Sequence, residues 1–250
     1  MKLLFTICGR AGSKGIKNKN VKNFLDKPLP LYTLSVIDLY LKKSTYDADI
    51  VINTDSEKLI DIFNNNSSRP VDIIERTPEL AGDDVAKIDV IQNCLEIMEE
   101  RNGIYDLIID LDITSPLRTE NDLNEMIEKK LNSDYDLIFS VTDSRRNPYF
   151  NMVMETEQGY DRVIKSNFNT RQEAPVIYDM NASIYVYSRE FLQRKVGLFD
   201  GKCGIHKMFD TGVLDLDHEN DMFLMEVIAK YLFENNGKFG EVYNNIKVKK

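Results

Sequence analysis

The chain has 250 residues, of which 42% are hydrophobic and 29% charged, and its formal net charge is −9. This composition is ordinary for a globular domain, and the acidic balance excludes a general nucleic-acid binder, which would carry a basic face. No apolar run approaches the roughly 20 residues that span a bilayer, and three scattered cysteines suit the reducing cytoplasm rather than a disulfide or zinc framework.

Apolar runs typical of strands alternate with helical stripes through the first 145 residues. The strands are predicted at Leu3–Cys8, Asp49–Asn53, Val71–Ile74, Leu107–Ile113 and Leu137–Val141. Helices are predicted between them, on stripes that begin at Leu31, Leu59, Ile88 and Leu123. Thr54 or Ser56 can cap the second of these helices, and Thr119 opens a capping box before the fourth. Such alternation indicates βαβ units and a mostly parallel sheet.

The pattern changes near residue 145. Met152–Glu155 and Arg162–Lys165 flank a Gln-Gly pair as the strands of a hairpin would, and Ser183–Tyr187 is a further strand. The α/β pattern returns with a strand at Val213–Asp217 and a helical stripe that begins at Leu224. The polar, basic residues after 243 are expected to be peripheral.

We therefore expect one domain over residues 1–250, with a β-rich arm inserted at about 145–205. The fold class is α/β, in three layers of helix, sheet and helix, with a mixed and mostly parallel sheet.

A glycine-rich, basic loop follows the first strand. Gly9 to Gly15 contains three glycines, which allow the backbone N–H groups to approach a ligand, and Arg10, Lys14 and Lys19 add positive charge in an acidic protein. The order of residues matches neither a Walker A loop nor a dinucleotide fingerprint. The loop either binds a triphosphate or is a solvated turn with surface lysines.

Several segments together resemble one enzyme family. Arg10 to Asn20, RAGSKGIKNKN, is similar to the opening motif of the acylneuraminate cytidylyltransferases, which make CMP-activated nine-carbon acid sugars. Further segments with this resemblance follow in the family's order: Asn53–Ser56, Arg76–Ala81, Thr114–Thr119, Arg171–Gln172, Asn181–Tyr185 and Asp215–Asp221. Within the family, residues 109–112, 145–151 and 170–183 look like those of the CMP-legionaminic acid synthetases.

The resemblance implies a nucleotidyltransferase-like fold, a homodimer formed through the arm, and a Mg²⁺-dependent reaction. In that reaction the C2 hydroxyl of a nonulosonic acid attacks the α-phosphorus of CTP, and pyrophosphate leaves. The substrate implied is N,N′-diacetyllegionaminic acid, with no nucleic-acid or membrane partner. Alternatives are the same reaction on N-acetylneuraminic acid or another acid sugar, and a nucleotide-binding regulatory subunit without catalytic activity.

The resemblance also assigns residues to the nucleotide. Arg10 and Lys19 would stabilise the leaving pyrophosphate, while the loop residues Ala11, Gly12, Ser13 and Lys14 would hold the triphosphate. Asn20 and Arg76 follow the family as nucleotide contacts; the alternative for Arg76 is a surface ion pair with Glu79 or Asp83.

Two carboxylates are candidates for the metal. Asp215 and Asp217 lie two apart on a predicted strand, so both side chains project from one face. Oxygen ligands on one face suit Mg²⁺, and the resemblance favours this role over a solvent-facing edge strand.

The remaining candidates belong to the sugar. Asp112, Phe150 and Asp179 stand where the sialic acid branch has Gln, Lys and Arg, so we expect them to contact a sugar with fewer hydroxyls and more N–H donors. Arg171 is the candidate for the sugar carboxylate, or else it stabilises the arm or an interface. Asn181 donates to the sugar or belongs to a turn, and Phe150 lines the pocket or packs beneath the arm.

Overall fold

The computed structural model describes residues 1–12, 15–82, 84–210, 216 and 218–248. Its centre is a seven-stranded sheet in the order β11-β7-β10-β6-β1-β4-β5. The strands of this sheet are β1 (Lys2–Cys8), β4 (Asp47–Thr54), β5 (Asp72–Glu75), β6 (Leu107–Leu111), β7 (Leu137–Asp143), β10 (Tyr178–Ser188) and β11 (Cys203–Lys207). Two small hairpins accompany it, β2 (Asn23–Phe24) with β3 (Lys27–Pro28), and β8 (Val153–Thr156) with β9 (Gly159–Arg162).

The sheet is mixed and mostly parallel, as predicted. β1 pairs in parallel with β4 and β6, β4 with β5, and β7 with β11. β10 is antiparallel to both of its neighbours, β6 and β7. The carboxyl ends of β1, β4, β5 and β6 therefore lie along one edge, where ligands of open α/β sheets bind.

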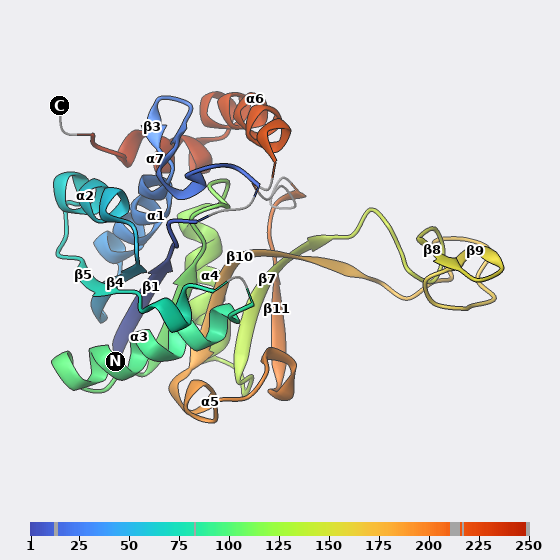
Figure 1. The fold of residues 1–250 in the computed structure, drawn as a ribbon, viewed down its shortest axis with the longest axis horizontal. Coiled ribbons are helices and arrows are strands. Elements are labelled where there is room, and N and C mark those ends of the chain that lie inside the picture. Colours follow the sequence, from blue (N-terminus) through green and yellow to red (C-terminus); the bar gives the residue numbers. More distant parts are fainter. Residues whose placement is uncertain (13–14, 83, 211–215, 217, 249–250) are drawn as a thin grey trace.

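Helices cover both faces of the sheet (Figure 1). They are α1 (Pro30–Lys43), α2 (Glu57–Asn66), α3 (Lys87–Asn102), α4 (Glu120–Leu131), α5 (Arg189–Gln193), α6 (Glu219–Asn235) and α7 (Gly237–Asn245), with short 3₁₀ turns at Lys19–Val21, Pro78–Leu80 and Leu198–Asp200. Within the described residues, none of the helices combines the length and apolar character of a membrane span.

The alternation of side chains along β1 divides the core in two. Leu3, Phe5 and Ile7 pack with α1, α2, α4, α6 and α7, whereas Leu4 packs with α3 and α5. This follows from the strand period of two, which sends successive side chains to opposite faces. The predicted three-layer α/β/α architecture is confirmed.

The predicted caps form, but the C-terminal expectation is wrong in part. The Ser56 hydroxyl accepts from the backbone N–H of Leu59, and Thr119 forms a reciprocal capping box with Asp122. The sequence patterns missed β11 and α7. Residues up to 245 belong to α7 and Ile246 is buried, because this segment packs on α1 and α6 instead of remaining peripheral.

A long arm leaves the body between β7 and β10, with the β8–β9 hairpin near its tip (Figure 1). Its turn places Gly159 at φ +113°, which glycine adopts most readily. The projecting part is shorter than the expected 145–205. Most of β10, together with α5 and β11, lies in the body, because β10 and β11 pair with strands of the main sheet.

Candidate functional site

The loop after β1 is held against the end of β4. The backbone N–H of Gly9 donates to the Asn53 carbonyl at 3.1 Å, and the N–H of Ala11 donates to Asp55 Oδ1 at 2.6 Å. A Cβ atom on Gly9 would lie 2.7 Å from the Ile113 side chain and 2.8 Å from the Leu59 side chain, so any other residue here would displace these two buried side chains. The start of the predicted phosphate loop is therefore anchored to the ligand edge of the sheet.

Two predicted nucleotide contacts, Asn20 and Arg76, meet at this loop. Asn20 Nδ2 donates to the Arg10 carbonyl at 3.1 Å. Arg76 Nε donates to Asn53 Oδ1 at 2.7 Å and Nη2 to the Asn53 carbonyl at 3.0 Å. The described contacts of Arg76 thus run to Asn53, the residue that also holds the loop, and not to the alternative partner Glu79. The other alternative partner, Asp83, lies outside the described residues.

Arg10 directly follows Gly9 in the chain, and Lys19 directly precedes Asn20. Arg10 is half-buried, and its Nη1 lies 3.5 Å from the Ala81 carbonyl. Lys19 begins a 3₁₀ turn directly after Asn18, whose backbone is left-handed at φ 58°. Gly12 is exposed, as a backbone that is to approach a ligand requires.

Four predicted site residues fall outside the described part of the chain: Ser13, Lys14, Asp215 and Asp217. The predicted strand at Val213–Asp217 also lies outside the described residues except for Leu216, which is buried.

Asp112 lies at the same edge, beyond the end of β6, in a charged cluster that the sequence patterns did not reveal. Lys87 Nζ is 2.6 Å from Asp112 Oδ2 and 2.7 Å from Asp110 Oδ2. Asp110 is fully buried and also accepts from the Thr6 hydroxyl at 2.8 Å. Lys87 is simply the first residue of α3, and no spacing in the sequence distinguishes it from a surface lysine.

Lys87 and Asp112 favour each other's charged forms. Burial alone would lower the pKa of Lys87, but Asp110 and Asp112 outweigh it and hold that pKa well above its ordinary value. Burial alone would raise the pKa of Asp112, but Lys87 and hydrogen bonds from Thr114 hold that pKa well below its ordinary value. Lys87 and Asp112 are therefore both charged at neutral pH.

The segment after Asp112 is fixed by a buried guanidinium. Arg118, with no exposed surface, donates to the Ser183 carbonyl and the Thr33 hydroxyl at 2.5 Å each, and to the Asp112 carbonyl. Burial lowers the pKa of Arg118 to about 10. The sequence marked Thr114–Thr119 only as a family segment, and the structure shows that its arginine joins α1, β10 and the Asp112 backbone.

Asp179 and Asn181 lie on β10. Asp179 is half-buried opposite Thr142. Asn181 is buried, where its Oδ1 accepts from the Ser140 hydroxyl at 2.6 Å and its Nδ2 lies 3.3 Å from the Met208 sulfur. Both ends of the Asn181 amide are thus used within the protein, so a direct contact with a sugar stays a prediction.

Phe150 and Arg171 lie on the arm, apart from the strand ends. Phe150 is half-buried, and the neighbouring Tyr149 packs edge-on against Phe168. Arg171 Nη2 donates to the Arg145 carbonyl at 2.8 Å and lines a hollow of about 240 Å³ at the base of the arm. The two arm residues are therefore not brought to Asp112 within this chain.

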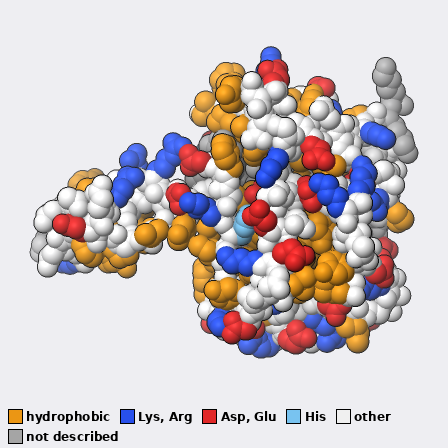
Figure 2. Space-filling model, turned by 180° about the vertical axis from the view of Figure 1, so that it is seen from behind, with side chains coloured by type: hydrophobic (Ala, Val, Ile, Leu, Met, Phe, Trp, Pro, Cys, Tyr) orange, Lys and Arg blue, Asp and Glu red, His pale blue; other side chains and the backbone are white. Residues whose placement is uncertain are grey.

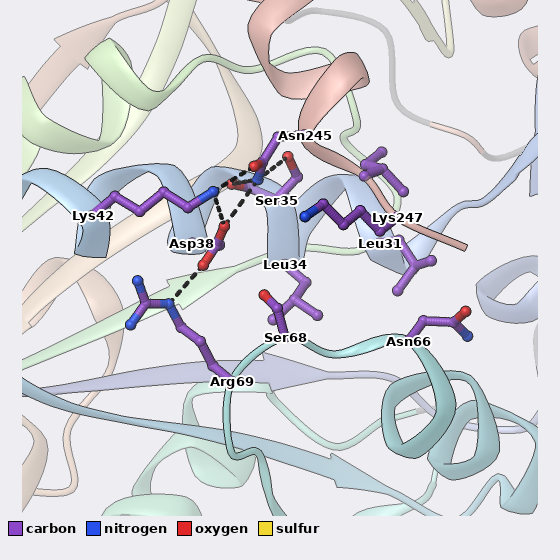
Figure 3. Close-up of a pocket in the computed structure, with 11 residues that line it drawn as sticks. Leu31, Leu34, Ser35, Asp38, Lys42, Asn66, Ser68, Arg69, Asn245 and Lys247 are labelled. Atoms are coloured by element: carbon purple, nitrogen blue, oxygen red, sulfur yellow. Dashed lines mark hydrogen bonds and ion pairs between the residues drawn. The ribbon is translucent and has the colours of Figure 1, made fainter. Parts of the chain in front are cut away.

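A larger hollow of about 370 Å³ lies elsewhere, between α1, the segment before β5 and the end of α7 (Figure 3). Asp38 lines this hollow, and the Asp38 carboxylate pairs with Lys42 and Arg69 at 2.7 Å each and accepts a hydrogen bond from Asn245. None of the predicted site residues lines it, and its charged lining consists of one carboxylate, Asp38, and three cations, Lys42, Arg69 and Lys247.

Comparison with known proteins gives consistent matches over nearly the whole chain. A family model described as "Cytidylyltransferase" matches residues 4–246. The chain is 37% identical over 232 residues to "Post-translational flagellin modification protein B" of Campylobacter coli, covering 91% of this chain and 95% of that protein. It is 35% identical over 230 residues to "CMP-N,N'-diacetyllegionaminic acid synthase" of Campylobacter jejuni, covering 90% and 94%.

The fold is also found among solved structures. A CMP:2-keto-3-deoxy-manno-octonic acid synthetase in complex with CTP superposes with a TM-score of 0.63 at 12% sequence identity, covering 92% of this chain and 99% of that one. At this identity the likeness concerns the fold alone, and it confirms the predicted nucleotidyltransferase-like architecture.

Proposed function

The chain belongs to the cytidylyltransferase family, and on that premise we propose that it transfers CMP from CTP to the C2 hydroxyl of a nonulosonic acid and releases pyrophosphate. The observation that supports this best is that the loop after β1, through Gly9, and Arg76 are both fixed to Asn53 at the end of β4, while Asn20 holds the Arg10 carbonyl. Asp112 lies at the same sheet edge. A triphosphate would lie where the loop N–H groups meet the cations Arg10 and Arg76.

The chain's part in the reaction is positioning and charge neutralisation. Arg10 and Lys19 would donate to the phosphate oxygens, and this charge stabilises the pyrophosphate as it departs. Ser13 and Lys14, together with the backbone of Ala11 and Gly12, would complete the phosphate site. Because Arg76 is held by Asn53 through two hydrogen bonds, its orientation is set before the nucleotide arrives.

A divalent metal fits the donor types proposed for this site. Asp215 and Asp217 would hold Mg²⁺ through carboxylate oxygens, the ligands that this ion prefers, and the ion when bound would neutralise phosphate charge.

The sugar is proposed to bind between Asp112 of one copy of the chain and the arm of a second copy. Asp112 would accept from an acylamino N–H, and Arg171 would hold the sugar carboxylate. Phe150, Asp179 and Asn181 complete the proposed contacts. The preferred substrate is N,N′-diacetyllegionaminic acid, which agrees with the printed name of one relative.

Because Phe150 and Arg171 lie on the arm, a second copy of the chain is proposed to bring them to a body edge. Exposed apolar side chains on the arm favour this homodimer, among them Val153, Tyr160 and Val176 at 67%, 76% and 76% exposure. Figure 2 shows hydrophobic side chains along the arm. We place the reaction in the cytoplasm, whose reducing conditions suit the three free thiols.

The proposal is tested by measuring pyrophosphate release with CTP, Mg²⁺ and a panel of acid sugars. We expect kcat/KM for N,N′-diacetyllegionaminic acid to exceed that for N-acetylneuraminic acid by up to roughly 10²-fold, since an apolar pocket rejects an added hydroxyl only modestly. Equal efficiency or the reverse order would favour the sialic acid alternative. CTP binding without pyrophosphate release on any sugar would favour a regulatory subunit.

A further inference from the structure

Lys87 joins two carboxylates, Asp110 and the proposed sugar contact Asp112. None of the roles proposed above uses this lysine. Lys87 Nζ lies 2.7 Å from Asp110 and 2.6 Å from Asp112, and its own side chain is 31% exposed. The Asp110 side chain is 0% exposed and the Asp112 side chain 22%. Lys87 thus connects Asp110, which no ligand can reach, with Asp112, which is partly exposed at the ligand edge of the sheet.

The hydrogen bonds of Asp112 leave one acceptor position. Oδ1 accepts from the backbone N–H of Thr114 at 3.0 Å and from its hydroxyl at 2.9 Å, and Oδ2 accepts from Lys87 at 2.6 Å. An ionised carboxylate offers about four lone-pair sites, so Oδ2 keeps one site for a donor from outside. These contacts also fix the plane of the carboxylate.

The charges explain why the lysine is needed. Two carboxylates that contact the same lysine, one at the end of β6 and the other just beyond it, would repel each other without that lysine and favour protonation of one of them. A protonated Asp112 would lose acceptor strength toward an N–H group. With Lys87 between them, Asp112 stays ionised without a counter-ion taken from the ligand.

We propose that Lys87 is a positioning residue for the sugar: by bridging Asp110 and Asp112 it holds Asp112 as a fixed, ionised acceptor whose remaining Oδ2 site receives an N–H donor of the acid sugar. The inference rests on the proposed function and deepens it, since it makes the choice of sugar depend on a residue of α3. It is a role exerted through Asp112, and Lys87 itself does not contact the reacting atoms.

The test uses Asp110→Asn as the background, because removing Lys87 alone would leave a buried, uncompensated charge and could unfold the chain. The Asp110 charge is absent from that background, so Lys87→Met tests only the hydrogen bond and counter-charge by which Lys87 holds Asp112. The variant is expected to fold, to raise the KM for N,N′-diacetyllegionaminic acid about 10-fold or more, and to change the KM for CTP less than about threefold. Lys195→Met is the matched control. It removes an exposed lysine that pairs with Glu96 at the same 2.7 Å, and it is expected to leave both KM values unchanged.

Asp112→Asn provides the second arm of the experiment, and it keeps the Lys87–Asp110 ion pair. If Lys87 acts through Asp112, the effects of Lys87→Met and Asp112→Asn on the sugar KM are not additive. The triple variant with Asp110→Asn, Lys87→Met and Asp112→Asn then shows little further rise in sugar KM over Asp112→Asn alone. Additive losses, an equal rise in both KM values, or a sugar KM within twofold of the background would overturn the inference. A parent enzyme that releases no pyrophosphate with any acid sugar would overturn the proposed function as well, whereas an active parent with unaffected variants would overturn the inference alone.

Discussion

Replacing Arg118 with methionine removes a buried guanidinium that fastens three parts of the chain. The side chain donates to the carbonyls of Ser183 and Asp112 and to the hydroxyls of Thr33 and Ser183. Methionine has a comparable length and fills much of the same space without polar atoms. The change therefore tests the hydrogen bonds with little change in packing.

The loss of stability depends on which hydrogen bonds the acceptor groups of Arg118 keep in the variant. The Ser183 carbonyl still accepts from the Asp112 N–H at 3.1 Å, and the Asp112 carbonyl still accepts from the Thr33 hydroxyl at 3.0 Å. Neither carbonyl becomes orphaned, so each lost bond costs about 1 kcal/mol instead of a full desolvation penalty. Removing the cost of burying the guanidinium offsets part of this loss. We expect the free energy of unfolding to fall by about 2–3 kcal/mol.

Urea unfolding measures this directly, as a lower midpoint with an unchanged slope. For a chain of this size the same loss lowers Tm by about 4–12 °C. Arg194→Met is the control: it removes an exposed arginine that pairs with Asp136 at 3.0 Å, which contributes about 0–1 kcal/mol. A loss above about 5 kcal/mol, or one no larger than the control, would refute this account of how the buried arginine acts.

Three further predictions concern the site and the acid stability. Asp215→Asn or Asp217→Asn is expected to lower kcat by orders of magnitude at saturating Mg²⁺ while Tm is kept; turnover within a few-fold of the parent would contradict a metal role. Lys19→Ala is expected to lower kcat about 10²-fold or more, whereas unchanged CTP kinetics would favour a solvated loop. Burial raises the pKa of Asp38, but Lys42, Asn245 and Arg69 outweigh it and hold that pKa below its ordinary value. Its ionised form therefore stabilises the fold above pH of about 4 and loses this effect as the pH falls further, so the stability difference between parent and Asp38→Asn should shrink in acid; a constant difference would contradict the assignment.

The sequence by itself determined the architecture and the ligand edge. Period-two runs such as Leu3–Cys8 and helical stripes such as the one from Ile88 are local signals, because the backbone periodicity is set by neighbouring residues. The glycine-rich loop after the first strand and the ordered family segments then indicated the nucleotide side of the site.

Only the tertiary structure decided how the site is held together. Lys87 reaches Asp112 across 25 residues of chain, and Arg118 reaches Ser183 across 65. Neither spacing carries a local signature, since both contacts arise when β6, α3 and β10 pack together. The arm likewise separates Phe150 and Arg171 from Asp112, although the sequence assigned all three to one sugar. The physical reason is that side-chain contacts between distant segments depend on strand order and crossover, which hydrophobic periodicity does not encode.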